Sequence, residues 1–412
     1  MSDSKVQKMG KRVLIAGAGI GGLTAALCLL KKGFDVQVLE QASDLKAVGA
    51  GIQLSANATR VLHGLGLEEP LKAATIVPSK KCVRIWNTGQ EWQLFDLGRE
   101  SLQRYGFPYM MLYRPDLHGI LVDALQAARP GALTLNAKVV KVDQRDDGVS
   151  ASLQDGTTVT ADLLIGADGV HSVARAQWIA EDKPRFSGCI AWRGVIPTEH
   201  LPARFSEPAG VNWVGPGRHV IHYLVNAGRL VSFTGIVEKG GDWGRESWTE
   251  QGSIEECLDD FRGWHEDVQA IVRQLKNPLR WAMMVRDPLA NWTRGRITLL
   301  GDAAHPTLPF LAQGAAMAIE DGCVVARALE RYPDDPAFAL QVYQATRIER
   351  TTRIVNGSAA NTKRFHNPQL ADPVAAERYV TEEWQESKVR ERYEWLFAYE
   401  PENVPLVAPV AA

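Results

Sequence analysis

The fold of this chain is decided by the stretch Val13-Leu14-Ile15-Ala16-Gly17-Ala18-Gly19-Ile20-Gly21-Gly22. A short β-prone apolar run, 13–16, leads into the glycines, and residues 23–32 have a helical composition that stops at Gly33. In the spacing G-x-G-x-x-G, the first glycine allows a tight turn, the second lets a pyrophosphate approach the backbone, and the third packs the helix closely on the strand. The stretch therefore predicts a strand, a turn and a helix whose N-terminus faces an anion.

An acidic residue follows at the distance that such a unit requires. A second apolar run, 36–39, ends at Glu40, where an acidic side chain accepts hydrogen bonds from ribose hydroxyls. With 36 glycines in 412 residues the glycine spacing alone is a weak signal, and a structural glycine-rich turn is the alternative interpretation. Because all the parts fall within one short unit, we predict a dinucleotide site. Its expected contacts are Gly17, Ala18, Gly19, Gly22 and Glu40.

The composition excludes several classes of protein. The chain has 412 residues, 45% of them hydrophobic and 23% charged, which is typical of a globular protein of two or three domains. A net charge of -2 gives no global attraction to nucleic acid or to an anionic membrane. No apolar run reaches the ~18 residues of a membrane span and the N-terminus has no signal-peptide core, so we expect a cytoplasmic protein. The five cysteines are scattered, which indicates neither a disulfide framework nor a metal site.

Two later apolar runs also end in an aspartate. Residues 162–165 lead into Gly166-Ala167-Asp168-Gly169, and residues 296–300 lead into Gly301-Asp302. An isolated aspartate at a strand end is more often a turn residue or a helix cap. Ligand groups of parallel sheets, however, lie at the carboxyl ends of the strands. Together with the glycine motif, both aspartates are therefore predicted to lie at the nucleotide site.

Further motifs follow in order along residues 11–365. Beside the glycine motif and Glu40 they are Val48-Gly49-Ala50-Gly51-Ile52-Gln53, Tyr113-Arg114-Pro115-Asp116-Leu117, Gly166-Ala167-Asp168-Gly169, Leu300-Gly301-Asp302-Ala303-Ala304-His305-Pro306 and Ala312-Gln313-Gly314-Ala315-Ala316-Met317-Ala318-Ile319-Glu320-Asp321. In these motifs the chain resembles the single-component FAD-dependent aromatic hydroxylases, the group of salicylate hydroxylase, 3-hydroxybenzoate 6-hydroxylase and 6-hydroxynicotinate 3-monooxygenase. The resemblance implies FAD as cofactor, NADH or NADPH as reductant and O2 as co-substrate.

The resemblance also implies which residues bind the cofactor. Gly314 and Ala315 would present backbone N–H groups to the pyrimidine edge of the flavin from the start of a helix that runs to about Tyr332, where the positive end of the helix dipole favours an anion. The alternative for Gln313-Gly314 is an ordinary helix start. Because no second glycine-rich unit occurs, the choice between NADH and NADPH cannot be read from the sequence. The expected FAD contacts outside the glycine turn are Glu40 at the adenosine ribose, Gln41, Val48, Arg114 near the pyrophosphate, Asp168, which also serves the nicotinamide cofactor, Asp302 at the ribityl chain, Gly314 and Ala315.

The expected fold class is α/β, with a Rossmann-like FAD-binding domain, an inserted β-sheet substrate domain and a helical C-terminal region. Strand-like runs such as 211–214 and 220–225 mark the insertion, and helical segments such as 117–128 mark the FAD-binding domain. The amphipathic segment 393–399 would pack either on the FAD-binding domain or on a second subunit of a homodimer, and the sequence leaves both open. The expected boundaries are 10–78, 100–180 and 285–365 for the FAD-binding domain, 79–99 and 181–284 for the substrate domain, and 366–412 for the C-terminal region.

One predicted strand carries the candidate catalytic residues. In the run Arg218-His219-Val220-Ile221-His222-Tyr223, His219 and Tyr223 are four residues apart and project from the same face, whereas His222 points to the opposite face. The spacing is similar to that of the 3-hydroxybenzoate and 6-hydroxynicotinate enzymes, in which both residues contact the ring hydroxyl of the substrate. We therefore predict His219 and Tyr223 as catalytic, with the imidazole as a base near neutral pH. The alternative is a histidine and a tyrosine that are satisfied within the core.

Other side chains are expected to border the substrate ring. The resemblance places Gln53, Pro306 and Phe310 there, and Pro306 also fixes the backbone of its loop. For His305, beside the flavin, a structural hydrogen bond is expected rather than a catalytic role. The two arginines of the expected substrate domain that could pair with a substrate carboxylate, neither of them assigned, are Arg84 and Arg193.

The choice of substrate follows from departures within the resemblance. Gln53, Ala304 and Phe310 stand where the 6-hydroxynicotinate enzymes have His, Cys and His, and Pro309 stands where the 3-hydroxybenzoate enzyme has Gln. The apolar run 308–311 is similar to sequences labelled salicylate hydroxylase. We therefore predict hydroxylation of a small aromatic hydroxy acid, first of all salicylate, which would lose CO2 and give catechol. The alternatives are the 3-hydroxybenzoate and 6-hydroxynicotinate activities, an FAD reductase that does not hydroxylate, and a flavin-binding sensor.

Overall fold

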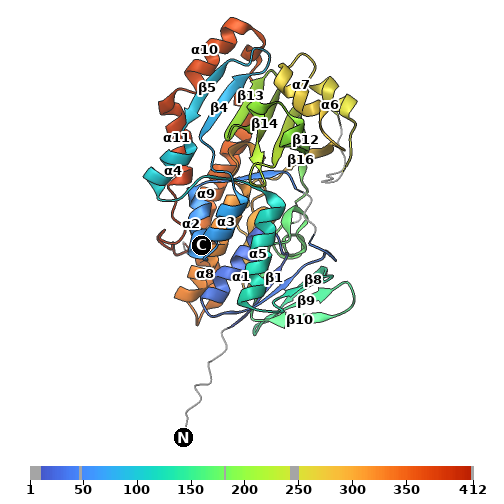
Figure 1. Cartoon of the computed structure of the whole chain (residues 1–412). Helices are drawn as coiled ribbons and strands as arrows, with labels where there is room; N and C mark the ends of the chain where they lie inside the picture. The colour runs from blue at the N-terminus through green and yellow to red at the C-terminus, as the bar shows by residue number, and fades with distance from the viewer. Residues whose placement is uncertain (1–10, 46–48, 181, 242–249, 410–412) are drawn as a thin grey trace.

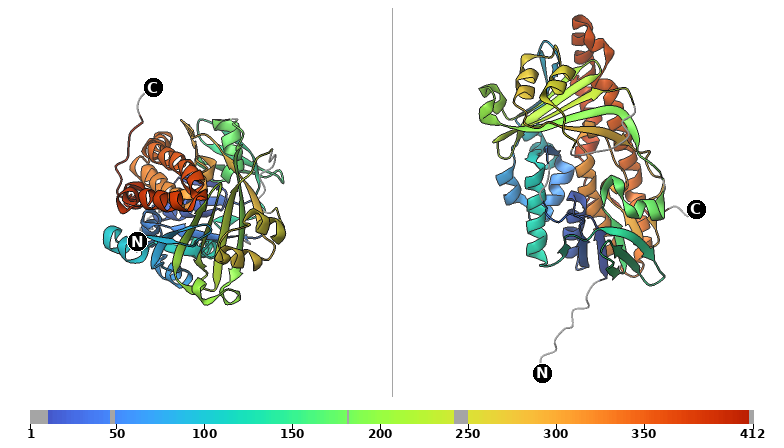
Figure 2. Two further views of the ribbon diagram at one scale, coloured as in Figure 1. Left: turned by 90° about the horizontal axis from the view of Figure 1, so that it is seen from above. Right: turned by 90° about the vertical axis from the view of Figure 1, so that its right-hand side faces the viewer.

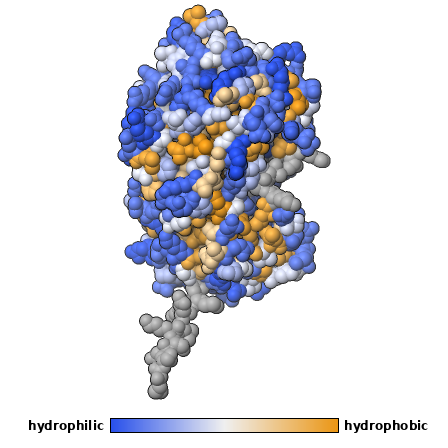
Figure 3. Space-filling view, in the orientation of Figure 1, coloured by the Kyte–Doolittle hydropathy of each residue, from blue (hydrophilic) through white to orange (hydrophobic). Residues whose placement is uncertain are grey.

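The computed structural model describes residues 11–409, apart from 46–48, 181 and 242–249. Figure 1 shows an upper half built on one large sheet and a lower half in which helices surround a second sheet. The two further views in Figure 2 show long helices at one side that connect the halves. Hydrophobic side chains gather across the middle of the face seen in Figure 3. Within the described segments, no helix is long and apolar enough to cross a membrane.

Counted over the described residues, the lower half contains a six-stranded sheet in the order β17-β18-β11-β1-β2-β7. Neighbouring strands are parallel except β17 and β18. Because β1 lies between β2 and β11, and β11 lies beside β18, the carboxyl ends of these strands meet at one edge. Helix α1 packs against both α5 and α8. The elements are β1 (Arg12–Ala16), β2 (Asp35–Leu39), β7 (Leu133–Thr134), β11 (Leu163–Gly166), β17 (Thr293–Arg294), β18 (Ile297–Leu299), α1 (Ile20–Lys31), α5 (Arg114–Ala128), α8 (Gly314–Arg331) and α9 (Pro336–Phe365).

The turn between β1 and α1 depends on its glycines. Gly17 has a φ of 104°, and a Cβ atom there would overlap the carbonyl oxygen of Ala167, just after β11. A Cβ atom at Gly22, in the first turn of α1, would overlap the carbonyl oxygen of Gly17. By contrast, a Cβ atom at Gly19 would meet nothing within 4 Å. The protein is therefore closely packed around two of the three motif glycines and open at the third.

The upper half contains, within the described residues, a seven-stranded sheet in the order β16-β12-β15-β14-β13-β4-β5. Neighbours are antiparallel except β13 and β4. One face packs on α6 and α7, and the other faces the lower half and the C-terminal helices. The elements are β4 (Lys80–Ile85), β5 (Glu91–Phe95), β12 (Arg185–Pro197), β13 (Ala209–Gly215), β14 (Arg218–Val225), β15 (Leu230–Glu238), β16 (Leu279–Val285), α4 (Leu97–Tyr105), α6 (Ile254–Asp260), α7 (Glu266–Arg273), α10 (Pro373–Glu383) and α11 (Glu386–Phe397).

Two smaller sheets complete the architecture. The antiparallel pair of β3 and β6 lies against β14 of the upper sheet, so it joins the two halves. A three-stranded antiparallel sheet, β10-β9-β8, lies beside β1 in the lower half. The remaining elements are β3 (Gly51–Leu54), β6 (Met110–Tyr113), β8 (Val139–Gln144), β9 (Val149–Leu153), β10 (Thr158–Ala161), α2 (Ala56–Gly64) and α3 (Glu68–Ala74).

The C-terminal helices pack on their own chain. The guanidinium of Arg350, on α9, donates to the carbonyl oxygens of Trp395 and Leu396 at 3.1 and 2.9 Å. The ring of Trp384 stacks on that of Phe365, with centroids 6.2 Å apart. The sequence alone leaves open whether segment 393–399 packs on the FAD-binding domain or on a second subunit. In this structure it contacts α9, the long helix that starts in the lower half.

We expect substitutions of the three motif glycines to have different effects. Gly22→Ala should destabilise the protein by about 1–3 kcal/mol, because the new methyl group overlaps backbone. Gly19→Ala should change the stability of the flavin-free protein by less than about 1 kcal/mol but abolish uptake of FAD, because its methyl group fills the open space. Urea unfolding and flavin absorbance measure the two effects.

The matched control is Gly119→Ala in the middle of α5, where a Cβ atom also meets nothing within 4 Å. This variant should be more stable by about 0.5–1 kcal/mol and should bind flavin normally. Normal flavin uptake by Gly19→Ala would show that the open side of the turn does not face the cofactor.

Candidate functional site

The carboxyl edge of the lower sheet brings together the glycine turn and Glu40. The backbone N–H of Ala18 donates to Oε2 of Glu40 at 2.8 Å, and the N–H of Ala42 donates to Oε1 at 2.8 Å. The N–H of Gly17 donates to the carbonyl of Leu39 at 2.7 Å. These bonds hold the carboxylate beside the turn, where its remaining lone pairs can accept bonds from a ribose.

The open side of the turn suits a pyrophosphate. Helix α1 begins after Gly19, which provides no side-chain cap, so the first N–H groups of the helix have no side-chain acceptor there. The positive end of the helix dipole lies at the same point. Space at Gly19 and a set of backbone donors together fit a bound dinucleotide and explain why two motif glycines are crowded and one is not.

Arg114, at the start of α5, and Asp302, in the loop after β18, interact electrostatically. Both side chains reach solvent, yet desolvation lowers the pKa of Arg114 and raises that of Asp302. Each charge partly offsets the shift of the other, and His305 also acts on Asp302. Two partly desolvated, opposite charges at this edge offer both a donor and an acceptor to a polar ligand.

Asp168 follows β11 at the same edge. Its Oδ2 accepts a bond from the N–H of Val173 at 2.8 Å, whereas Oδ1 is buried and has no hydrogen-bond partner among the described residues. Burial raises the pKa of this carboxyl group, although bonds from Ser172 and the backbone lower it. An acceptor that is buried without a donor indicates a position for a ligand.

The start of α8 is oriented toward this region by side-chain hydrogen bonds. Gly314 and Ala315 are half-buried at the N-terminus, and Gln313 precedes them. The amide of Gln313 donates to Oγ of Ser55 at 3.0 Å and accepts from Nδ2 of Asn57 at 3.0 Å. An 18-residue helix that starts here has backbone donors and a positive dipole end at its N-terminus, which would suit a negatively charged ring.

A buried charge cluster, not predicted from the sequence, joins α8 to α9. Arg347 donates to Oδ1 of Asp321 at 2.7 Å, and Arg350 donates to Oε1 of Glu320 at 2.7 Å. His305 Nε2 lies 2.7 Å from the other oxygen of Asp321, which is the structural bond expected for this histidine. Burial would raise the pKa of Asp321, but the charges of His305 and Arg347 lower it to about 2. Two adjacent acids within the apolar first part of the helix, 314–326, were the signal in the sequence.

On the substrate side, Tyr223 of β14 points toward β3. A Cβ atom at Gly51 would lie 2.6 Å from its hydroxyl oxygen, so the tyrosine packs where that glycine has no side chain. Burial raises the pKa of Tyr223, while bonds with Gln53 and Ser232 act against the rise. The amide oxygen of Gln53 also accepts a bond from the hydroxyl of Tyr109 at 2.6 Å. Tyr223 and Gln53, predicted from segments 170 residues apart in the chain, therefore lie together.

His219 lies on the same face as Tyr223 and is fully buried. Its Nδ1 is 2.6 Å from Nε2 of His366, and its ring contacts that of Phe310 edge-on, with centroids 5.0 Å apart. Burial and the neighbouring His366 lower its pKa well below the ordinary value. The imidazole is therefore neutral near pH 7 and can accept a hydrogen bond from a phenol, but the lowered pKa makes it a weaker base than the sequence predicts.

His222 lies on the opposite face, as expected. Its ring is 5.4 Å from that of Phe205 and 6.5 Å from that of Trp213, centroid to centroid. Burial, together with the charge of Arg84, lowers its pKa to about 3. Arg84 itself is paired with Glu91 and with Asp267 on this outer face, so it does not serve the inner face.

The other predicted residues take varied positions. Pro306 is buried next to His305, and Gln41 is exposed after Glu40. Arg193 faces the lower half, where its guanidinium lies over the ring of Trp281, and desolvation and the nearby Arg114 lower its pKa to about 10. The last of the predicted cofactor contacts, which lies outside the described residues, is Val48.

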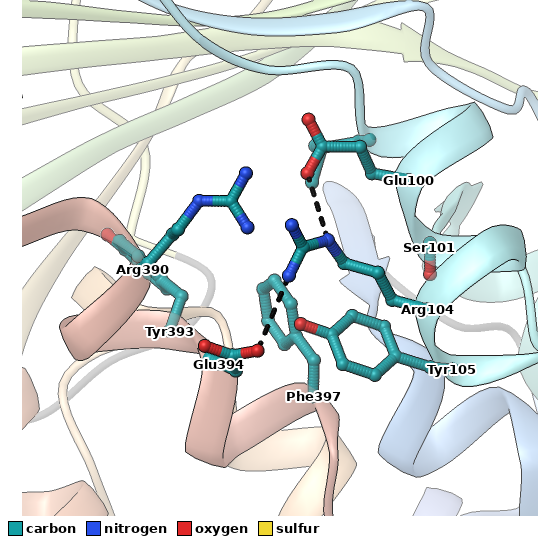
Figure 4. A pocket seen from close by; sticks show the side chains of 9 residues that line it. Glu100, Ser101, Arg104, Tyr105, Arg390, Tyr393, Glu394 and Phe397 are labelled. Atoms are coloured by element: carbon teal, nitrogen blue, oxygen red, sulfur yellow. Dashed lines mark hydrogen bonds and ion pairs between the residues drawn. The ribbon is translucent and has the colours of Figure 1, made fainter. Parts of the chain in front are cut away.

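A surface groove between α4 and α11 is separate from these residues. Figure 4 shows Arg104 spanning it, with Glu100 at 3.5 Å and Glu394 at 3.4 Å. None of the residues predicted for the site lines this groove. Apart from Val48, the predicted residues lie instead at the carboxyl edge of the lower sheet, on the inner face of the upper sheet and in the segments between them.

Comparisons with known proteins point the same way. The model of the FAD binding domain family matches residues 11–358. A 3-amino-4-hydroxybenzoate 2-monooxygenase of Streptomyces cremeus is 40% identical over 87% of this chain and 88% of the relative. A 6-hydroxynicotinate 3-monooxygenase of Pseudomonas fluorescens is 37% identical over 97% of each chain. Among solved structures, HpxO of Klebsiella pneumoniae with FAD and uric acid has a TM-score of 0.80 at 25% identity and covers 96% of this chain and 98% of that one. The expected fold class is confirmed.

Acid should destabilise the protein through His222. The native pKa is about 3 and the unfolded value is near 6.5, so between these values the unfolded state binds the extra proton and stability falls as pH falls. Unfolding in urea from pH 7 to 4 should lose on the order of 1 kcal/mol per pH unit from this residue. His222→Asn should have a shallower slope, and the exposed His200→Asn should keep the wild-type slope. Equal slopes in all three proteins would contradict this role.

Glu40→Ala should lower the affinity for FAD at least tenfold, because it removes acceptors from the ribose and loosens the turn that the carboxylate holds. Titration of flavin-free protein with FAD, followed by fluorescence, measures the effect. The exposed Glu391→Ala on α11 is the control and should bind as wild type. Stoichiometric flavin retained by Glu40→Ala through purification would disprove the assignment.

Proposed function

The chain belongs to the FAD binding domain family and is an FAD-dependent aromatic monooxygenase, and from this premise we propose that it hydroxylates a small benzoic acid with a ring hydroxyl group. One observation supports this most strongly. The side chains of His219 and Tyr223 project from the same face of β14, where Tyr223 bonds with Gln53 and His219 contacts Phe310. A base, a phenol and an amide beside an apolar ring form a pocket wall suited to a phenolic substrate.

The cofactor would be held by the edge of the lower sheet. Glu40 would bind the adenosine ribose, the turn at Gly19 the pyrophosphate, Asp302 the ribityl chain, and the start of α8 the flavin ring. When bound and reduced by NADH or NADPH, FAD supplies the activation of O2 for transfer of one oxygen atom to an aromatic ring. The remaining chemistry is positioning, exclusion of water and control of one proton.

His219 would control that proton. An aromatic ring is more nucleophilic when its hydroxyl group is deprotonated, so transfer of the hydroxyl proton to Nε2 of His219 would activate the substrate. Nε2 is buried, and it can accept this proton because it has no hydrogen-bond partner in the described part of the chain. Tyr223 and Gln53 would orient the substrate through hydrogen bonds, and the apolar Phe310 would keep water from the ring.

Salicylate is the substrate that we propose first. Gln53, Ala304 and Phe310 depart from the residues of the 6-hydroxynicotinate enzymes, and Pro309 departs from that of the 3-hydroxybenzoate enzyme. Its hydroxylation with loss of CO2 would give catechol. The second candidate is 3-amino-4-hydroxybenzoate, because a relative with 40% identity is named for this substrate. Both are hydroxybenzoates, so one assay tests them together.

The test uses purified holoprotein with NADH or NADPH and a panel of salicylate, 3-hydroxybenzoate, 3-amino-4-hydroxybenzoate and 6-hydroxynicotinate. Oxygen uptake and product mass are followed in parallel. We expect one acid to stimulate both and to gain one oxygen atom, with net loss of CO2 for salicylate. If every acid gives only hydrogen peroxide, the proposed substrate class is wrong.

Replacement of His219 should separate chemistry from cofactor binding. His219→Ala should lower the rate of hydroxylation by roughly 100-fold or more, which is typical for loss of a general base, and should keep its FAD. His222→Ala, on the opposite face of the same strand, is the matched control and should lose much less. Product formation by mass spectrometry and bound flavin by absorbance are the measurements, and equal losses would refute the assignment of faces.

A further inference from the structure

Three side chains from distant segments form a line from the surface to the inner face of the upper sheet. Nδ1 of His219 lies 2.6 Å from Nε2 of His366, and Nδ1 of His366 lies 2.8 Å from Oε1 of Glu238. His219 and His366 are 0% and 4% exposed, whereas the side chain of Glu238 is 53% exposed. The line therefore starts in the interior and ends in solvent.

Backbone hydrogen bonds hold the outer part of this line in place. His366 ends helix α9, where its N–H donates to the carbonyl of Thr362 at 3.0 Å. Its own carbonyl accepts from the N–H of Gly217 at 3.2 Å, in the turn between β13 and β14. Glu238 ends β15, and its N–H donates to the carbonyl of Gly217 at 3.0 Å. One turn thus fixes both residues relative to His219 on the adjoining strand.

Only one arrangement of protons satisfies this line when both rings are neutral. A carboxylate is only an acceptor, so Nδ1 of His366 carries the proton that Glu238 accepts. Nε2 of His366 is then an acceptor, and Nδ1 of His219 must donate to it. Nε2 of His219 is left with a free lone pair, and this buried atom has no hydrogen-bond partner among the residues described. The line therefore sets the tautomer in which His219 is a base toward the inner face.

The surroundings of the line favour transfer of a proton along it. His219 is flanked by the rings of Phe310 and Phe365, each with its centroid 5.0 Å away, so Nε2 lies in an apolar environment. Burial lowers the pKa of His366, while Glu238 and the carbonyl end of the 30-residue helix α9 partly offset that effect. Cys189 on β12 faces Glu238, and burial and that carboxylate raise the pKa of its thiol to about 12, so it stays neutral.

We propose that His366 and Glu238 are positioning residues that relay the hydroxyl proton of the substrate from His219 to solvent. This inference rests on the proposed function. The O–H bond of the substrate breaks as an N–H bond forms at Nε2 of His219. The proton on Nδ1 of His219 moves to Nε2 of His366, and the proton on Nδ1 of His366 moves to the carboxylate of Glu238, which releases it to water. One proton enters and one leaves, and both rings end in the opposite tautomer. When a proton returns from water along the same line to the product oxygen, both rings regain their starting tautomers, and no further reactant is needed.

The first test compares Glu238→Gln and His366→Ala with wild type, using the acid of the panel that wild type hydroxylates. We expect turnover at saturating substrate to fall roughly tenfold to a hundredfold, with KM and bound FAD nearly unchanged. Added imidazole should restore part of the turnover of His366→Ala, because it can carry a proton between His219 and Glu238. The control is Glu199→Gln, an exposed residue, which should keep wild-type turnover. Wild-type turnover in both relay variants would overturn the proposal.

The second test needs no turnover. In ¹⁵N spectra of histidine-labelled holoprotein without substrate, His219, assigned by comparison with His219→Ala, should carry its proton on Nδ1. In Glu238→Gln, a fraction should carry it on Nε2, because an amide can also donate to His366. A proton on Nε2 of His219 in wild type would overturn the relay. The expected spectra from a protein that hydroxylates no acid of the panel would support the relay arrangement and count against the proposed function instead.

Discussion

Two adjacent carboxylates buried in α8, Glu320 and Asp321, hold the parts of the site together. Asp321 accepts bonds from the N–H of Gly301 at 3.1 Å and from His305, which ties the loop after β18 to the helix. Glu320 accepts from Asn57 at 2.5 Å, which ties the start of α2 to it. Arg347 and Arg350 of α9 balance both charges. Loss of one partner from such a buried pair leaves an uncompensated charge at a cost of about 3–5 kcal/mol, so these segments keep their relative positions.

This constraint explains how the carboxyl edge of the lower sheet can keep polar groups without partners from the protein. Among the described residues, Oδ1 of Asp168 is buried without a hydrogen-bond partner, and Arg114 and Asp302 are partly desolvated. Such groups are costly unless a ligand binds them. The closely packed charges behind α8 and the apolar core of the lower sheet hold them in position in spite of that cost. The backbone around the predicted cofactor contacts is therefore fixed by packing within the chain itself.

The upper sheet divides its two faces between different tasks. Its outer face buries His222 among aromatic side chains of β13 and the loop before it, and pairs Arg84 with acids, which serves stability. Its inner face turns His219 and Tyr223 toward β3 and the C-terminal helices. Since α9 starts in the lower half and delivers His366 to this inner face at its end, the same helix that balances the charges of α8 also completes the line to Glu238.

The sequence by itself determined the nucleotide turn, the α/β class, the strand ends at Asp168 and Asp302 and the opposite faces of His219 and His222. All of these follow from local spacing, because turns, helices and strands have fixed geometries. Only the tertiary structure decided that Glu320 and Asp321 meet arginines about thirty residues later, and that His366 and Glu238 align with His219. Such contacts join segments that are far apart in the chain, and no regular sequence spacing predicts them. They form only when the whole molecule packs.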